Sequence, residues 1–180
     1  HRRSQPRRGV LVFFKRSHYE DVLIVRVHYL VPKKVWSDRY QQINAFERRR
    51  VANGTHILKF FLHISKEEQL ERFKDRLDDP ERQWKISEAD YSEREYWADY
   101  DAASEDALSK CSTADAPWFV IPSNHKWFRN LAISQIIVET MQNIGIKVPK
   151  PTVNIAEILR KYHDAAAEEE LEDNKKKKCQ

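Results

Sequence analysis

Residues 58–97, LKFFLHISKEEQLERFKDRLDDPERQWKISEADYSEREYW, decide the fold of this chain. The segment opens with an apolar run, residues 59–64, that is typical of a buried β-strand. Ser65 then stands three residues before Glu68, which is the spacing of a capping box and predicts that a helix begins here. Pro80 is expected to end that helix. The residues beyond Pro80 are too polar to pack as a core, which favours a mobile arm over an anionic substrate.

The expected helix has three chemically different faces. Leu70, Phe73 and Leu77 share the face that should pack inward, while Arg72 and Arg76, one turn apart, share a second face. Acidic residues fall on the third face. Two arginines on one face can hold phosphate oxygens bidentately.

Charge alone favours a different interpretation of this region. Residues 66–85 hold six basic and seven acidic side chains, so the region is no simple basic patch. A solvated helix held by salt bridges would have the same composition. After Pro80, Ser87 and Asp90 could cap a further helix that carries Tyr91, Trp97 and Tyr100. Aromatic residues beside cations can stack on a nucleobase, but they more often belong to a core.

The rest of the chain alternates between strand and helix patterns. Strands are expected at residues 10–14 and 118–121, helices at 36–53, 130–144 and 154–167, and polar loops at 112–117 and 123–129. Asn53 and Gly54 are expected to end the first of these helices. Alternation of this kind predicts an α/β fold, a three-layer sandwich with a mostly parallel sheet. A charged helical insertion between two of its strands resembles the lid of a nucleotide kinase.

Composition limits the possible classes of protein. The 180 residues fit one domain and are 41% hydrophobic, enough for a real core. No apolar run is long enough to span a membrane, and no signal peptide is visible. Two isolated cysteines, Cys111 and Cys179, lack metal-ligand spacing and fit a reducing compartment, so we expect a cytoplasmic protein. The net charge of +4 permits a polyanionic ligand without requiring one.

The sequence predicts three regions. Residues 1–8 form a basic, flexible tail, residues 9–151 form the main domain with a lid at about residues 65–110, and residues 152–180 form a C-terminal helix followed by a disordered charged tail.

Four stretches carry a resemblance to a known family. They are FKRSHYEDVLIVRVH, WSDRYQQINAFERRRVANG, the lid segment extended through WADYDAASEDAL, and STADAPWFVIPSNHKWFRNLAISQII. In unbroken order they resemble the C-terminal two-thirds of the polyphosphate kinase 2 family. The resemblance implies a P-loop kinase fold with a helical lid, and phosphoryl transfer between inorganic polyphosphate and nucleoside mono- or diphosphates with Mg²⁺. It also implies a homo-oligomer, a dimer or a tetramer.

The resemblance assigns roles to nine residues. Arg16, Arg72 and Arg76 match arginines expected to act on the transferring phosphate or the phosphate chain, and these are the catalytic candidates. The candidates for polyphosphate or nucleotide binding are Lys15, Asp21, Arg26, Lys85, Lys126 and Arg129. No metal ligand is assigned.

Two departures from the family pattern bear on activity. Only three glycines occur, and the family's glycine-rich phosphate loop is absent from the chain, so we expect it upstream of His1. Without that loop the chain alone should transfer phosphoryl groups very slowly or not at all. Lys15 stands where the family has Asp or Asn; a lysine cannot ligate magnesium but could bind phosphate directly.

Three functions therefore compete. The first is a polyphosphate-dependent nucleotide kinase present here as a partial chain. The second is an inactive fragment or relative that binds polyphosphate or nucleotide without turnover. The third is a nucleic-acid binder, which the offsetting acidic residues make the least favoured, since such a binder needs a net cationic surface. No membrane partner is expected.

Overall fold

The computed structural model describes residues 9–178. These residues form two compact units, the first ending at Glu139 and the second beginning at Thr140. The elements are, in order, η2 (His18–Asp21), α1 (Ile24–Val27), α2 (Lys33–Ala52), β1 (Lys59–His63), α3 (Lys66–Asp78), η3 (Gln83–Lys85), α4 (Glu88–Glu93), η4 (Arg94–Tyr96), α5 (Trp97–Cys111), β2 (Trp118–Pro122), α6 (Lys126–Ile144) and α7 (Ile155–Lys178), where η marks a 3₁₀-helix.

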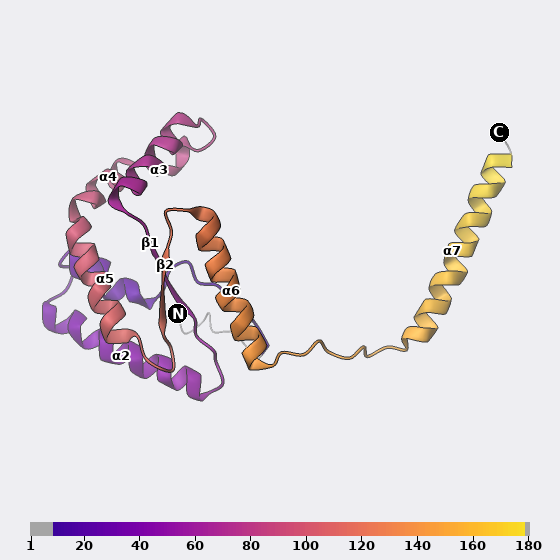
Figure 1. The fold of residues 1–180 in the computed structure, drawn as a ribbon, viewed down its shortest axis with the longest axis horizontal. Coiled ribbons are helices and arrows are strands. Elements are labelled where there is room, and N and C mark those ends of the chain that lie inside the picture. Colours follow the sequence, from indigo (N-terminus) through magenta and orange to yellow (C-terminus); the bar gives the residue numbers. More distant parts are fainter. Residues whose placement is uncertain (1–8, 179–180) are drawn as a thin grey trace. The chain divides into compact units, whose positions relative to one another are not determined.

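The two strands form a parallel pair at the centre of the first unit. Lys59 lies opposite Trp118, and His63 lies opposite Pro122. Figure 1 shows the strands between α5 on one side and the first part of α6 on the other. Because the strands are parallel, their carboxyl ends lie at the same edge, and α3 and α6 both begin there. The predicted α/β class is confirmed as a mostly helical α/β fold with two parallel strands.

Local sequence signals explain where the helices of the predicted lid, residues 65–110, begin and end. The Ser65 hydroxyl accepts a hydrogen bond from the Glu68 amide at 3.2 Å, as the capping pattern predicts. Helix α3 ends at Asp78, two residues before Pro80. Ser87 and Asp90 form the capping box of α4. The inward face of α3 is narrower than predicted: Phe73 is buried, whereas Leu70 and Leu77 are about half exposed.

The core lies where η2, α2 and α5 meet. Small residues on α5, Ala107 and Cys111, allow its backbone to approach the large side chains of α2. The cluster comprises Tyr19, Val22, Trp36, Tyr40, Ile43, Ala107 and Cys111. The predicted helix at residues 36–53 is confirmed, and Gly54, with φ of 81°, follows its end in the left-handed region that favours glycine.

A charged pair lies beneath this core, almost entirely out of water. Lys59 is 7% exposed and Glu47 is 1% exposed, and Lys59 Nζ lies 2.6 Å from Glu47 Oε2. Lys59 Nζ also donates to the Tyr19 hydroxyl at 3.0 Å and to the Cys111 carbonyl at 2.7 Å. The Tyr19 hydroxyl in turn donates to Glu47 Oε1 at 2.9 Å. Every buried charge in this cluster is therefore compensated, as burial requires.

Two predicted elements are corrected by the structure. Residues 10–14 form no strand and their side chains are exposed, because an apolar run becomes a strand only when a neighbour takes its backbone hydrogen bonds, and β1 and β2 pair with each other here. The predicted loop at residues 123–129 is shorter, since α6 already begins at Lys126.

The second unit contains the end of α6 and the helix α7. This last helix continues to Lys178, well beyond the Ala167 predicted as its end, and its backbone is helical where we expected disorder. Alanine, glutamate, leucine and lysine dominate this stretch and all favour helix. The basic tail predicted at residues 1–8 lies outside the described residues, and the predicted division near residue 151 stays a prediction. None of the helices in residues 9–178 is long and apolar enough to cross a membrane.

Removing one partner of the buried pair should destabilise the fold strongly. We expect Lys59→Met to lower the free energy of unfolding by roughly 3–5 kcal/mol, because the Glu47 carboxylate would remain buried without its cation. Urea denaturation followed by circular dichroism measures the change. The control is Lys74→Met on α3. Because the pair of Lys74 with Asp78 is exposed, this change should leave the midpoint of urea unfolding unchanged. Equal losses in both variants would contradict the prediction.

The same pair should make stability depend on acid pH. Burial favours the neutral form of Glu47, but hydrogen bonds from His18, Lys59 and Tyr19 outweigh it and lower its pKa below the ordinary 4.5. A lowered folded-state pKa gives stability that is present above the unfolded pKa and is lost as pH falls through the folded one. We expect the free energy of unfolding to fall less steeply below about pH 4.5 in Glu47→Gln than in the wild type. Parallel curves of unfolding free energy against pH for the two proteins would contradict this prediction.

Candidate functional site

Hydrogen bonds join the two segments that follow the strands at their carboxyl edge. The Ser123 amide, just after β2, donates to the His63 carbonyl at the end of β1 at 2.7 Å. The Ser65 amide donates to Asn124 Oδ1 at 3.0 Å. These bonds fix the turn before α3 against the turn before α6. Ligands of open α/β sheets bind at this edge, outside the carboxyl ends of the strands.

Arg72 braces α3 against this edge. Its Nη2 donates to the carbonyls of Ser123, at 2.5 Å, and Asn124, at 3.2 Å. Its Nε donates to Glu68 Oε1 at 2.7 Å, one turn back on α3. The side chain is 19% exposed. Arg72 therefore joins α3 to the turn before α6. The Glu68 carboxylate supplies the opposite charge that orients the guanidinium.

The Arg76 side chain contacts the backbone of Lys85. Arg76 Nη1 donates to the Lys85 carbonyl at 3.4 Å, and its guanidinium lies 5.7 Å from the Phe73 ring centre. The Lys85 ammonium lies 5.0 Å from the ring centre of Trp84, which is 78% exposed. This part of the lid offers two cations and an exposed indole ring, in contrast to the engaged Arg72.

Arg94 is a lid residue that the sequence did not single out. Its Nη1 donates to the Lys66 carbonyl at 2.9 Å and to Gln69 Oε1 at 2.6 Å. It thereby fastens η4 to the first turn of α3. An arginine paired with a backbone carbonyl leaves no signal in the sequence, so this contact could only come from the structure.

Arg16 and Lys15 precede η2 and are exposed. The Arg16 side chain is 85% exposed, and its Nε lies 3.7 Å from Glu20 Oε1. Ser17 follows as the cap of η2, its hydroxyl accepting from the Tyr19 amide at 3.3 Å. Such an exposed ion pair is weak, and it leaves the Arg16 guanidinium accessible to an anion.

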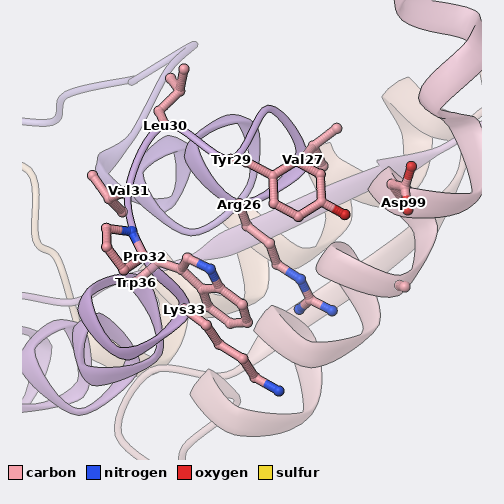
Figure 2. Close-up of a pocket in the computed structure, with 10 residues that line it drawn as sticks. Arg26, Val27, Tyr29, Leu30, Val31, Pro32, Lys33, Trp36 and Asp99 are labelled. Atoms are coloured by element: carbon pink, nitrogen blue, oxygen red, sulfur yellow. The ribbon is translucent and has the colours of Figure 1, made fainter.

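Arg26 lies in a different environment, a pocket of about 540 Å³ between α1, the start of α2 and α5. Figure 2 shows its guanidinium beside Trp36, with Lys33 and Asp99 also at the pocket. Arg26 lies 4.8 Å from the Trp36 ring centre and is paired with Asp106 at 2.5 Å. Burial lowers the pKa of Arg26, but hydrogen bonds to Asp106 and Tyr40 outweigh it and raise that pKa above its ordinary value.

The three remaining candidates take up positions on the surface. Lys126 lies in the first turn of α6 and is exposed, and Arg129, also in α6, donates to Asn130 Oδ1 from Nε at 3.1 Å and from Nη2 at 2.9 Å. The Asp21 carbonyl accepts from Arg39 Nη1 at 2.7 Å. The structure thus places Lys126 directly after the turn that Arg72 braces. The roles of all nine candidates stay predictions.

Comparison with known proteins identifies close relatives of the chain. The model of the family described as Polyphosphate kinase 2 matches residues 1–149. An AMP/ADP-polyphosphate phosphotransferase from Meiothermus ruber is 52% identical over 146 residues, covering 81% of this chain and 55% of the relative. An ADP-polyphosphate phosphotransferase from Rhodopseudomonas palustris is 46% identical over 162 residues, covering 83% and 56%.

A solved structure agrees with these matches. The crystal structure of polyphosphate kinase 2 from Arthrobacter aurescens TC1 superposes with a TM-score of 0.82 at 40% sequence identity, covering 91% of this chain and 58% of that one. The chain spans about half the length of the curated relatives it matches.

The two lid arginines should differ in their contribution to stability. We expect Arg72→Ala to lower the free energy of unfolding by roughly 1–3 kcal/mol, because the carbonyls of Ser123 and Asn124 lose a charged donor. Arg76→Ala should change it by less than about 0.5 kcal/mol, since Arg76 makes one long hydrogen bond. Thermal and urea unfolding of both variants measure the difference, and a larger loss in Arg76→Ala would show that the brace is assigned to the wrong arginine.

Proposed function

The chain belongs to the polyphosphate kinase 2 family, and we propose that it is the lid-bearing part of a polyphosphate-dependent nucleotide kinase. The reaction moves a phosphoryl group between inorganic polyphosphate and a nucleoside mono- or diphosphate, such as AMP, ADP or GDP. The observation that carries the proposal is the strand edge at which Arg72 joins α3 to the turn before α6. Lys126 directly follows that turn, and Arg76 lies one turn beyond Arg72 on α3.

The chemistry explains why such a site would consist of cations. A terminal phosphoanhydride P–O bond of polyphosphate breaks, and a P–O bond to the terminal phosphate oxygen of the nucleotide forms. Both reactants are polyanions, so catalysis depends on positioning and on neutralising charge. In our proposal Arg16, Arg72 and Arg76 contact the transferring group and the phosphate chain.

The other cations hold the two substrates around the reacting group. Lys85 binds further phosphate oxygens, and Lys15 can bind phosphate at the position where the family has Asp or Asn. Lys126 and Arg129 hold the nucleotide, and Arg26 is a further candidate for binding either substrate. Asp21 is a binding candidate because it follows Arg16 closely in the sequence. Its carbonyl accepts a hydrogen bond from Arg39, which holds this part of the chain in place.

Magnesium is part of the proposal only as the family's metal. Bound Mg²⁺ would neutralise phosphate charge. Across the part of the chain that the structure describes, no three His, Cys, Asp or Glu side chains gather in a group that could hold a metal ion. We therefore assign no magnesium ligand among these residues.

Binding without turnover is the second candidate function. It is favoured by the sequence itself, which holds no glycine-rich phosphate loop among its three glycines. A chain of this kind would hold polyphosphate or nucleotide through the same arginines but would lack a backbone cradle for the transferring group. Assembly into a homo-oligomer would be compatible with either function.

Polyphosphate binding tests what the two functions share. We expect the 180-residue chain to bind medium-length polyphosphate in isothermal titration calorimetry, and Arg76→Ala to weaken the affinity about tenfold, the loss of one charge-assisted contact. The matched control is Lys161→Ala on α7, an exposed cation outside the proposed site, which should leave the affinity unchanged. Equal weakening in both variants would mean that only net charge matters.

Turnover separates the two functions. ATP formation from ADP and polyphosphate, followed by a luciferase assay, is expected to be very slow or absent in this chain. Robust ATP formation that Arg76→Ala abolishes would establish the kinase and contradict the expected inactivity of the chain alone. Polyphosphate binding without turnover would favour the second function. Tighter binding of DNA than of polyphosphate at physiological salt would overturn both.

A further inference from the structure

The two residues that follow Ser17 are held by one buried carboxylate. The Tyr19 hydroxyl donates to Glu47 Oε1 at 2.9 Å, and His18 Nε2 lies 3.3 Å from the same oxygen. The ring of Tyr19 packs edge-on against Trp118 at 4.8 Å between centroids. The start of η2 is therefore fixed by both polar and apolar contacts.

That carboxylate is itself held in place by Lys59, which is fixed in turn by α5. Glu47 belongs to α2, and its second oxygen is paired with Lys59 of β1 at 2.6 Å. Lys59 also donates to the carbonyl of Cys111 at the end of α5. Because all these groups are buried, a shift of any one of them would leave a polar group unpaired. The position of η2 is thus set by the strand, α2 and α5 together.

Arg16 has no comparable support of its own. Its side chain is 85% exposed, and its ion pair with Glu20 is long, at 3.7 Å. An exposed pair of this kind does little to fix a flexible side chain. The place from which Arg16 extends is therefore determined by the anchored residues that follow it, up to Tyr19.

We propose that Glu47, with Lys59 and Tyr19, forms a positioning network that presents Arg16 to polyphosphate. The inference rests on the proposed function, because it needs Arg16 to contact the polyanion. The three residues of the network touch no ligand; they act through the backbone of His18 and Tyr19. Fixing that backbone before binding removes part of the ordering cost that Arg16 would otherwise incur on contact.

A double-mutant cycle on polyphosphate affinity tests the network. Tyr19→Phe removes one hydroxyl, keeps the aromatic ring on Trp118, and leaves Glu47 paired with Lys59, so the fold should survive. In the wild-type background we expect Arg16→Ala to weaken polyphosphate binding about tenfold. In the Tyr19→Phe background the same change should weaken it only about twofold, because residues that act together are not additive.

Two controls separate positioning from a general loss of stability. Ile43→Val lies in the same core cluster and carries no hydrogen bond, so Arg16→Ala should keep its full effect in that background. The effect of Arg76→Ala should be the same with Tyr19 or Phe at position 19. Amide hydrogen exchange should rise at residues 17–21 in Tyr19→Phe and stay unchanged in α6.

The outcomes separate this inference from the proposed function. Intact polyphosphate binding with an unchanged effect of Arg16→Ala in the Tyr19→Phe background would overturn the positioning network alone. Coupling of similar size in the Ile43→Val background would overturn it as well, since any loss of core packing would then suffice. Failure of the wild-type chain to bind polyphosphate would overturn the proposed function together with the network's role in it.

Discussion

The rest of the structure depends on the buried pair of Lys59 and Glu47. Two opposite charges without access to water are tolerated only when each finds its partner and its remaining hydrogen bonds. Here those partners come from four segments distant in sequence, so a single arrangement of η2, α2, β1 and α5 satisfies them all. Hydrophobic residues of similar volume could supply comparable stability. The pair adds a directional constraint, because hydrogen bonds require particular distances and angles whereas hydrophobic burial is non-directional.

A second constraint operates at the carboxyl edge of the strands. There Arg72 can hold α3 in place and bind a phosphate at the same time. The hydrogen bonds to Ser123, Asn124 and Glu68 employ its Nε and Nη2 groups. A guanidinium has five N–H donors, and the two on Nη1 are not needed for these bonds. Arg72 can therefore hold the lid helix in place and still offer a donor to a phosphate. The brace would then orient the catalytic candidate, as the network around Glu47 orients Arg16.

The sequence predicted those parts of the fold that depend on neighbouring residues. The cap at Ser65, the stop before Pro80 and the capping box at Ser87 are local, and the structure contains all three. The prediction of a strand at residues 10–14 was wrong because strand formation depends on a partner elsewhere in the chain. Leu70 and Leu77 were assigned inward from periodicity alone, although burial also needs a facing element.

The candidate site was predictable in its residue types but not in its contacts. Arg72 and Arg76 share a helical face and were equivalent in the sequence. In the structure Arg72 donates to the carbonyls of Ser123 and Asn124 beyond β2, whereas Arg76 makes one long hydrogen bond, to the Lys85 carbonyl. Lys59 was predicted only as the first residue of an apolar strand. No local sequence pattern indicates that Glu47, twelve residues earlier, is its partner. Pairings between distant residues and bonds to backbone groups leave no local pattern.

These contacts bear on how a lid with more acidic than basic residues could serve a polyanion. Glu68 orients Arg72, and the acids paired with Lys74 and Arg82 neutralise cations along the lid surface. Neutralised cations attract a phosphate chain only weakly, so affinity would come from the few guanidinium groups that keep free donors. Such a site gains selectivity from where its cations are anchored rather than from their number. The anchors are the strand edge for α3 and the buried carboxylate of Glu47 for the segment after Arg16. A polyanion with regularly spaced phosphates can contact several fixed donors that lie far apart, whereas a small anion cannot reach all of them at once.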